Sequence, residues 1–224
     1  CMQTFEKYLN PLHTRLDRIV DFSRLTPKEK LYEEEYPHLK QVTKINVKIC
    51  KQLIKKFHDL EIELEEQAKI IQMETDLDSR KDAVGVYNKI LQSIMEYVER
   101  INIELIKVDT PYFGKIIFRT KIRDTQKDLS IYIGKFALMD PDTYQLLISD
   151  WRSPIANIYY ENSGPTSNLR YETPNGIKTG DLIQKRQFSI SEARINHIYD
   201  AKSGNAAADE FLLAQLTERL GQKL

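Results

Sequence analysis

Two long stretches of helical periodicity, joined by a few residues, constrain the fold of this chain most strongly. Apolar residues recur in steps of three and four along the first stretch: Leu39, Val42, Ile45, Ile49, Leu53, Phe57, Leu60, Leu64, Ala68 and Ile71. The second stretch repeats mostly in steps of four and three: Ala83, Tyr87, Ile90, Ile94, Tyr97, Ile101, Leu105 and Val108. An apolar stripe needs an apolar partner, and the short link over 75–79 forces the helices to run antiparallel. The sequence therefore predicts a long antiparallel coiled-coil hairpin.

Helix-start signals mark both predicted helices. Thr26-Pro27-Lys28-Glu29 combines a capping box with proline at the first helical position. Pro37 is expected to kink or restart that helix, and Ser79 is expected to cap the second one. We therefore expect an arm over 27–110, preceded by a shorter helical segment over 1–26.

Beyond residue 110 the apolar pattern alternates by two, and glycine and proline recur between short segments. The expected strands cover 112–118, 129–138, 144–151, 156–161, 169–172, 181–190 and 194–200. Asn175-Gly176 is a strong hairpin signal, because a type I′ turn needs positive φ at both central residues. We expect a small antiparallel, barrel-like β domain over 111–200 and a helix over 201–224. The predicted fold class is α+β.

The bulk composition favours no particular chemistry. Lys plus Arg and Asp plus Glu both total 33, so no net field attracts nucleic acid. Two cysteines are too few for a disulfide framework, which fits a reducing compartment. No apolar run approaches the ~20 residues that span a bilayer. We expect a soluble cytoplasmic protein that does not bind membranes.

Motifs for catalysis and for metal or cofactor binding are missing from the sequence. It contains no Gly-x-x-x-x-Gly-Lys-Ser/Thr loop, no Gly-x-Gly-x-x-Gly and no Gly-x-Ser-x-Gly. The four histidines are scattered along the chain, without metal-ligand spacing. We therefore expect no catalytic residue, no metal site and no cofactor within this chain.

Charge is polarised along the first predicted helix. Six lysines and no acid lie within 40–56, whereas eight acids and one lysine lie within 59–78. One interpretation is that these are solvated flanks of a coiled coil, which set its register and solubility. The other is that Glu74, Asp76 and Asp78, at the acidic end, bind a basic or metal-bearing pocket of a partner. The sequence leaves both open.

The only tryptophan lies in the segment Asp150-Trp151-Arg152-Ser153-Pro154. We interpret this segment as a strand-end corner without chemistry of its own. Trp151 is expected to fill the core and Asp150 to accept hydrogen bonds from Arg152 or the turn. Pro154 is expected to end the strand ladder.

A nucleic-acid contact is the alternative interpretation of the same region. Bases would stack on Tyr159 and Tyr160, which are expected to be exposed, while Arg152 would bind a phosphate.

Four stretches occur in an order and spacing that resemble a known family. They are PYFGKIIF (111–118), IYIGKFALMD (131–140), SDWRSPIANIYYE (149–161) and YETPNGIKTGDLIQKRQF (171–188). Together they resemble the N-terminal region of HelD-type proteins, UvrD-like superfamily 1 DNA helicases of Gram-positive bacteria, over most of 28–224. The family also places a long antiparallel coiled coil before PYFG and a helix like ADEFLLAQL (208–216) after the β segment. The structural signature residues on this resemblance are Gly114, Gly134, Asp150, Trp151, Arg152 and Pro154.

The resemblance implies a portion of a longer protein. In the family an adenine-binding motif and the Walker A loop follow this region, and both are absent here. ATP and Mg would therefore bind elsewhere in the parent, which would contact DNA through its motor domains. The family binds RNA polymerase, inserts the coiled coil into the channel leading to the active site, and uses ATP to release the enzyme from DNA.

RNA polymerase is thus the partner that the resemblance implies for Glu74, Asp76 and Asp78, and we expect a monomeric protein. Two alternatives stay open: a free-standing coiled-coil adaptor without a motor, and a nucleic-acid-binding β domain.

Overall fold

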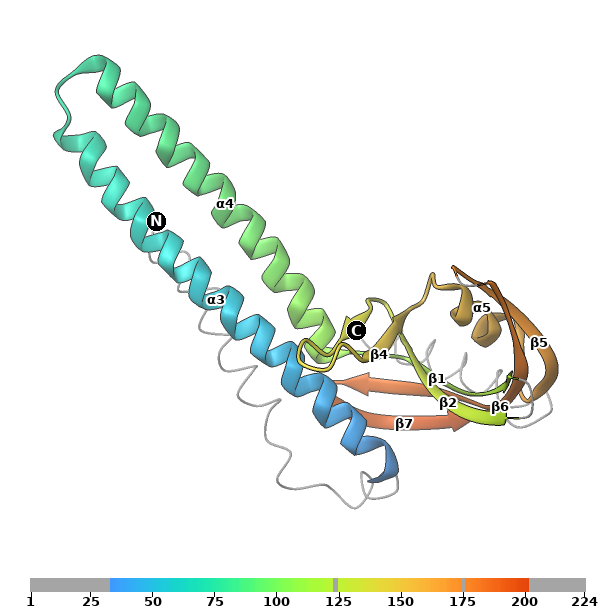
Figure 1. Ribbon diagram of the computed structural model, residues 1–224. Coiled ribbons are helices and arrows are strands. Elements are labelled where there is room, and N and C mark those ends of the chain that lie inside the picture. The colour runs from blue at the N-terminus through green and yellow to red at the C-terminus, as the bar shows by residue number, and fades with distance from the viewer. Residues whose placement is uncertain (1–32, 123–124, 175, 202–224) are drawn as a thin grey trace, which may run out of the picture. The chain divides into compact units, whose positions relative to one another are not determined.

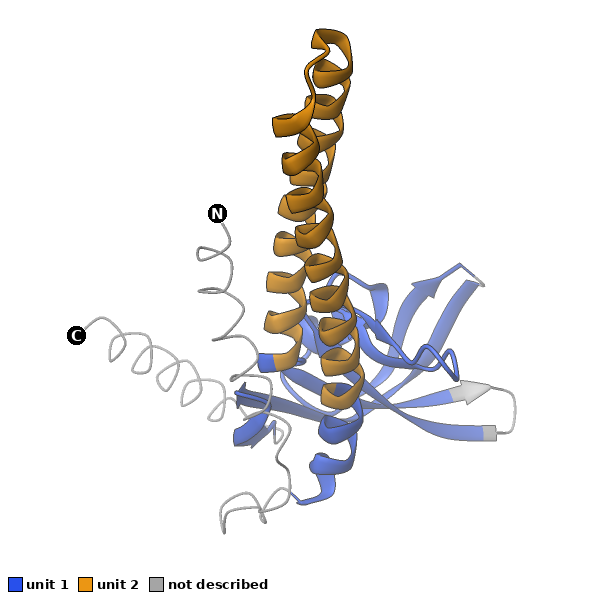
Figure 2. Ribbon diagram, turned by 90° about the vertical axis from the view of Figure 1, so that its left-hand side faces the viewer, with its two compact units in different colours: residues 1–42, 109–224 blue, residues 43–108 orange. Residues whose placement is uncertain are grey.

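The computed structural model describes residues 33–122, 125–174 and 176–201 (Figure 1). The chain divides into two compact units, one of residues 43–108 and the other of residues 1–42 together with 109–224 (Figure 2). Helices precede a sheet that occupies most of the later described residues, which confirms the mixed α+β class. The helical segment expected over 1–26 lies outside the described residues, and so does the expected C-terminal helix beyond residue 201.

The unit of residues 43–108, which we call the helix pair, consists of the greater part of two long helices. Helix α3 (Tyr36–Met73) follows a 3-10 turn, η1 (Glu33–Glu35), and α4 (Leu77–Asp109) runs back antiparallel after residues 74–76. Side-chain hydrogen bonds join the helices at both ends. The Asn46 amide donates to the carbonyl of Lys107 at 3.0 Å, and the Gln67 amide donates to the carbonyl of Ala83 at 3.2 Å. Regular coiled-coil packing along the pair stays a prediction.

The face of α4 that the sequence predicted to be apolar is the buried face. Its buried residues are Ala83, Ile90, Ile94, Ile101, Leu105 and Val108, all at predicted positions. On α3, Leu53 and Phe57 are buried, whereas Leu60, Leu64 and Ile71 nearer the link are half-buried. Apolar burial therefore stabilises the half of the pair away from the link more strongly.

The sheet has the strand order β3-β4-β2-β1-β6-β5, and β7 pairs with β6. The strands are β1 (Gly114–Ile122), β2 (Thr125–Gly134), β3 (Leu138–Met139), β4 (Leu146–Asp150), β5 (Thr166–Thr173), β6 (Gly176–Ser191) and β7 (Arg194–Asp200). Within the described part of the chain the pairing order ends at β3 and β5, so the expected barrel-like closure is not confirmed.

One strand pair corrects the expectation of an antiparallel sheet. Strands β2 and β4 pair in parallel, through Ile133 with Ser149 and Gly134 with Asp150. After β2 the chain turns back as β3, two places away in the strand order, and β4 then lies between them, in the same direction as β2. The other pairs, including β5 with β6, are antiparallel. Asn175 of the predicted Asn175-Gly176 turn lies outside the described residues.

The turn between β6 and β7 has the backbone that such a short connection needs. Glu192 and Ala193 have φ values of 51° and 54°, the positive values of a type I′ turn. Asp109 holds this turn, because its carboxylate accepts a hydrogen bond from the Glu192 N–H at 2.8 Å and its carbonyl accepts one from the Ala193 N–H at 3.0 Å.

The segment expected as a strand over 156–161 is a helix. Helix α5 (Pro154–Glu161) buries Ala156, Ile158 and Tyr159 against β1, β2 and β6. The core residues from these strands are Ile116, Phe118, Ile133 and Leu182. The prediction is wrong because, in a run this short, the apolar positions fit the helical period as well as the alternation.

Candidate functional sites

Two carboxylates organise the link of the helix pair by binding backbone amides. Glu74 Oε1 accepts hydrogen bonds from the N–H groups of Thr75 and Asp76, at 2.9 and 3.0 Å. Asp76 Oδ2 accepts one from the Ser79 N–H at 2.9 Å, and this contact holds the pKa of Asp76 below its usual value. Asp76 is therefore the N-cap of α4. The prediction that Ser79 caps this helix is wrong, since the aspartate three residues earlier supplies the acceptor.

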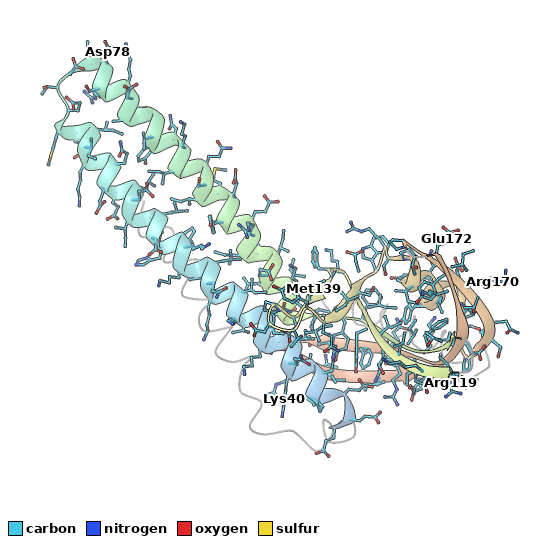
Figure 3. The ribbon with its side chains drawn as sticks, viewed as in Figure 1. Lys40, Asp78, Arg119, Met139, Arg170 and Glu172 are labelled. Atoms are coloured by element: carbon cyan, nitrogen blue, oxygen red, sulfur yellow. The ribbon has the colours of Figure 1, made fainter. Side chains whose placement is uncertain are left out.

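Asp78, which lies at the same end of the helix pair, is not engaged by backbone amides in this way (Figure 3). Its side chain is 90% exposed and pairs with Lys81 Nζ at 3.1 Å, one turn further along α4. Exposed pairs of this kind contribute little to stability. Of the three acidic residues predicted to bind a partner, Asp78 is thus the one whose carboxylate is most available.

Exposed apolar side chains flank the same link. Met73, the last residue of α3, is 80% exposed, and Leu77, the first residue of α4, is 73% exposed. Neither residue belongs to the predicted apolar stripe. Their position beside the link is a signal in the sequence that they are exposed, but the acidic residues alone do not point to them. Apolar surface bordered by charge is typical of protein interaction sites.

Backbone hydrogen bonds fix the corner around Asp150, between β4 and α5. The Trp151 N–H donates to the carbonyl of Gly134 at 3.0 Å, and the Arg152 N–H donates to Asp150 Oδ1 at 2.8 Å. Pro154 is the first residue of α5, where its missing N–H removes no helical hydrogen bond. Asp150 thus accepts the turn hydrogen bond that was expected of it.

Trp151 does not fill the core. Its side chain is 43% exposed, and the guanidinium of Arg152 lies 5.3 Å from its ring centroid. The expectation is wrong because the chain turns at the end of β4, and Ala156, Ile158 and Tyr159 of α5 enter the core.

Only one of the two tyrosines expected to stack on bases is exposed. Tyr160 is 51% exposed, but Tyr159 is 4% exposed. Lys185 Nζ lies 4.4 Å from the Tyr159 ring centroid. The exposure expected of Tyr159 is therefore wrong, and a stacking site would rest on Tyr160 and Arg152.

The signature glycines lie where other groups pack directly on the backbone. A Cβ on Gly114 would lie 2.7 Å from a ring carbon of Tyr159, and one on Gly134 would lie 2.5 Å from the carbonyl oxygen of Pro111. Both distances are shorter than van der Waals contact, so a larger residue at either position displaces its neighbour.

A buried charge cluster, centred on Glu35, joins η1 to the sheet. The Glu35 carboxylate has no exposed surface and accepts hydrogen bonds from Lys115 Nζ at 2.7 Å, Arg186 Nη1 at 2.6 Å and the Tyr132 hydroxyl at 2.8 Å. Burial acts to raise the pKa of Glu35, but these donors outweigh it and hold the pKa below its usual value. The sequence gives no signal for this cluster, because its members are distant along the chain.

Arg186 extends the Glu35 cluster to a further strand. Its guanidinium also binds Glu34, and its Nε donates to Asp200 of β7 at 2.6 Å. These carboxylates raise the pKa of Arg186 although burial opposes this. The carboxylates from η1 and β7 therefore pair with the guanidinium from β6. This pairing indicates a structural role for the cluster.

His38 lies beside this cluster and is neutral near pH 7. Its ring stacks on that of Tyr132, with centroids 3.5 Å apart, and tilts against Tyr112 at 5.5 Å. Burial lowers the pKa of His38 to about 4. Its Nε2 atom is buried without a hydrogen-bond partner among the described residues.

The described residues include neither a membrane-spanning helix nor a metal-binding cluster. None of their helices is long and apolar enough to cross a membrane. No group of three or more of their His, Cys, Asp or Glu side chains is placed to hold a metal ion.

An exposed helix-pair end that combines carboxylates with apolar side chains is typical of an interaction domain. The family described as DNA helicase IV HelD, N-terminal domain, matches residues 6–210 of this chain. Because this match covers most of the sequence, the chain belongs to the HelD N-terminal domain family. The resemblance noted from the sequence motifs is thereby confirmed, and membership associates the chain with a DNA helicase. No curated protein matches the chain.

Proposed function

We propose that this chain is the partner-binding N-terminal part of a HelD-type helicase. The end of the helix pair, residues 73–78, inserts into RNA polymerase and helps to release the enzyme from DNA. ATP hydrolysis, Mg binding and DNA translocation belong to other parts of the parent protein, which acts as a cytoplasmic monomer. The observation that carries the proposal is the family match over 6–210, together with a helix pair whose end exposes Met73, Leu77 and Asp78.

The dimensions and charge of the helix pair support this role. Helix α4 has 33 residues, which corresponds to about 50 Å. A pair of such helices is slender enough to enter a channel. Carboxylates at the entering end are attracted to basic walls and to a bound magnesium ion, while Met73 and Leu77 provide apolar contact area. Insertion therefore uses both kinds of side chain.

The test must remove charge at the link without breaking its hydrogen bonds. Lysine at position 76 would remove the N-cap of α4, so we choose the triple variant Glu74→Gln, Asp76→Asn and Asp78→Asn. Glutamine and asparagine keep a carbonyl oxygen as acceptor at positions 74 and 76, and asparagine is a good N-cap. We expect the triple variant to bind RNA polymerase about tenfold more weakly in surface plasmon resonance.

The matched control is Glu63→Gln, Glu66→Gln and Glu99→Gln, which removes three exposed carboxylates elsewhere on the same helices. It should bind within about twofold of the unsubstituted chain. Equal affinities of the two triple variants would show that the acidic residues of the link do not contribute to RNA polymerase binding.

Nucleic-acid binding by the sheet unit is less well supported. Arg152 and Tyr160 are exposed, but Asp150 lies close to both. Its Oδ1 is 3.7 Å from Arg152 Nε, and its charge adds to burial in raising the pKa of Tyr160. A carboxylate in this place repels phosphate, so we rank partner binding by the helix pair first.

A further inference from the structure

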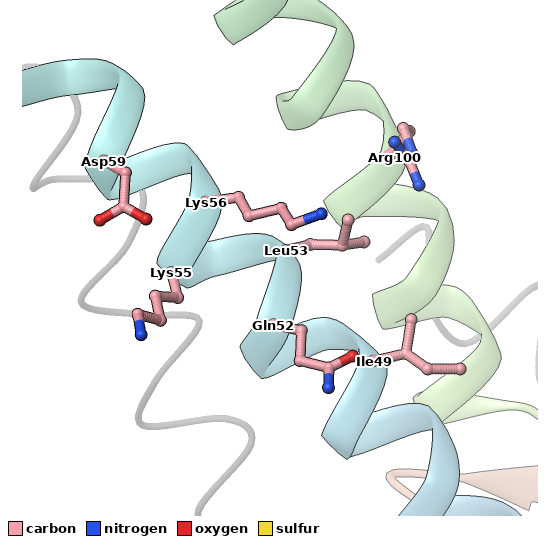
Figure 4. A pocket seen from close by; sticks show the side chains of 7 residues that line it. All are labelled: Ile49, Gln52, Leu53, Lys55, Lys56, Asp59 and Arg100. Carbon is pink, nitrogen blue, oxygen red and sulfur yellow. The ribbon is translucent and has the colours of Figure 1, made fainter. Parts of the chain in front are cut away.

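A groove with a predominance of positive charge lies on the helix pair, away from its acidic end (Figure 4). We call it the basic groove. It has a volume of about 520 Å³ and is lined by Ile49, Gln52, Leu53, Lys55, Lys56 and Asp59 of α3 and by Arg100 of α4. Lys56 extends from α3 toward α4, where Arg100 stands on the facing helix. The groove therefore brings cations from two helices together over an aliphatic floor.

Within the described part of the chain, the cations of the basic groove are not paired with a carboxylate. Among the described residues, Lys55, Lys56 and Arg100 form no salt bridge, although Asp59 lies in the same lining. The Arg100 guanidinium lies 5.4 Å from the ring centroid of Tyr97. Three cations against one carboxylate leave an excess of positive charge, and their mutual repulsion is relieved when an anion binds.

A line of lysines leads along α3 into this groove. Lys44, Lys48 and Lys51 precede Lys55 in steps of four, three and four residues, so all four share one face of the helix. All four are exposed, and they span about 16 Å along the axis. No acid lies between residues 40 and 56. A regular line of cations suits an extended polyanion better than a compact one.

The residues that line the groove are suited to binding phosphates and not to binding bases. Among the described residues, the lining includes no aromatic ring on which a base would stack. Its polar groups are the ammonium and guanidinium donors, the Gln52 amide and the Asp59 carboxylate. The donors bind phosphate oxygens and outnumber the single carboxylate, which repels them. The groove thus suits a repeating phosphodiester backbone.

We propose that the basic groove binds the phosphate backbone of a nucleic-acid strand. Arg100 and Lys56 hold phosphates across the groove, and Lys55 with the lysine line follows the strand along α3. The aliphatic floor of Ile49 and Leu53 contacts sugars. This site is separate from residues 73–78 and does not depend on the proposed insertion into RNA polymerase.

The test measures the 224-residue chain against a fluorescein-labelled 30-nucleotide single-stranded DNA by fluorescence anisotropy, over a series of KCl concentrations. The groove variant is Lys55→Gln, Lys56→Gln and Arg100→Gln, since glutamine keeps helix propensity close to that of lysine and arginine. We expect its affinity to fall at least about tenfold. The slope of log affinity against log salt should become shallower by about 2, because three contacts each contribute roughly 0.7 on a single strand.

A matched control removes the same residue types from the same helices outside the groove: Lys69→Gln, Arg80→Gln and Lys89→Gln. It should keep the affinity within about twofold and the original salt slope. Equal losses in the two variants would show binding through net charge alone and overturn the proposal. Absence of DNA binding by the unsubstituted chain at 50 mM KCl would also overturn it.

Two further arms separate the sources of phosphate and the class of partner. ATP and pyrophosphate, added at the phosphate concentration of the DNA, should not displace the strand, and complete displacement would identify a free polyphosphate as the ligand instead. RNA polymerase binding should be unchanged in the groove variant. If the groove variant lost polymerase binding but kept DNA binding, the groove would be a site for an acidic protein surface, and the proposal would fall.

Discussion

Glu35 stays ionised in the interior because Lys115, Arg186 and Tyr132 converge on it. A substitution that removes one charged partner from such a cluster leaves an uncompensated buried charge. No sequence pattern predicts the cluster, because its other members lie 80, 97 and 151 residues from Glu35 along the chain. Side chains fixed by local geometry were more predictable, and Asp150 makes the turn hydrogen bond that its position suggested. The sequence therefore predicts contacts between neighbouring residues but misses those between distant ones.

His38 makes the stability of the sheet unit depend on pH. Its folded pKa of about 4 lies below the ordinary value of 6.5, so the unfolded chain takes up the proton first as the pH falls. The contribution of His38 to stability is therefore present above pH 6.5 and is lost toward pH 4. Between pH 7 and pH 5 we expect the free energy of unfolding to fall by about 2 kcal/mol through this residue.

The measurement is urea unfolding followed by the fluorescence of Trp151, at pH 7 and at pH 5. His38→Phe keeps an aromatic ring against Tyr132 but does not titrate, so its stability should change less over this range. His58→Gln, at a side chain that is 66% exposed, controls for the loss of a histidine elsewhere in the chain. Identical pH dependence in His38→Phe and the unsubstituted chain would show that His38 carries none of it.

Apolar periodicity predicted the buried face of α4 correctly, and capping chemistry was harder to predict. The segment Asp76 to Ser79 offers three good N-cap residues, Asp76, Asp78 and Ser79, and the choice among them depends on where α3 ends and how the link turns. Glu74 fixes the conformation of the link by accepting hydrogen bonds from the N–H groups of Thr75 and Asp76. Helix α5 shows the opposite difficulty, because its short apolar run fits two periods and only the packing on Ile116 and Phe118 decides between them.

Asp76 should control the fraying of α4 at its first turn. Asp76→Ala removes the acceptor for the Ser79 N–H, so we expect the amides of residues 77–80 to exchange with deuterium several-fold faster. Asp76→Asn retains an acceptor and should stay close to the unsubstituted chain. The check is hydrogen-deuterium exchange with mass spectrometry, with Asp82→Ala as an exposed control one turn later. Unchanged exchange in Asp76→Ala would contradict the capping role.

The sequence as a whole has balanced charge, and this balance hides a segregation along one helix. Lysines occupy α3 up to Lys56, and acids dominate from Asp59 to Asp78. The sequence predicted this segregation, the α+β class and the family. It did not predict that Arg100 of α4 joins Lys55 and Lys56 in one groove, because the register between two helices is set by their packing. It also did not predict the parallel β2–β4 pair, which depends on where β3 lies.

We propose that residues 73–78 are the part of the chain that touches RNA polymerase, and crosslinking tests this directly. A photo-crosslinking amino acid, benzoylphenylalanine, replaces Leu77, which is 73% exposed at that end of the helix pair. The matched control places it at Ile177, which is 65% exposed on β6. Irradiation with purified RNA polymerase should crosslink the chain from position 77 and give little product from position 177. Crosslinking from position 177 alone, while the chain still binds the polymerase, would contradict the proposal that residues 73–78 touch RNA polymerase.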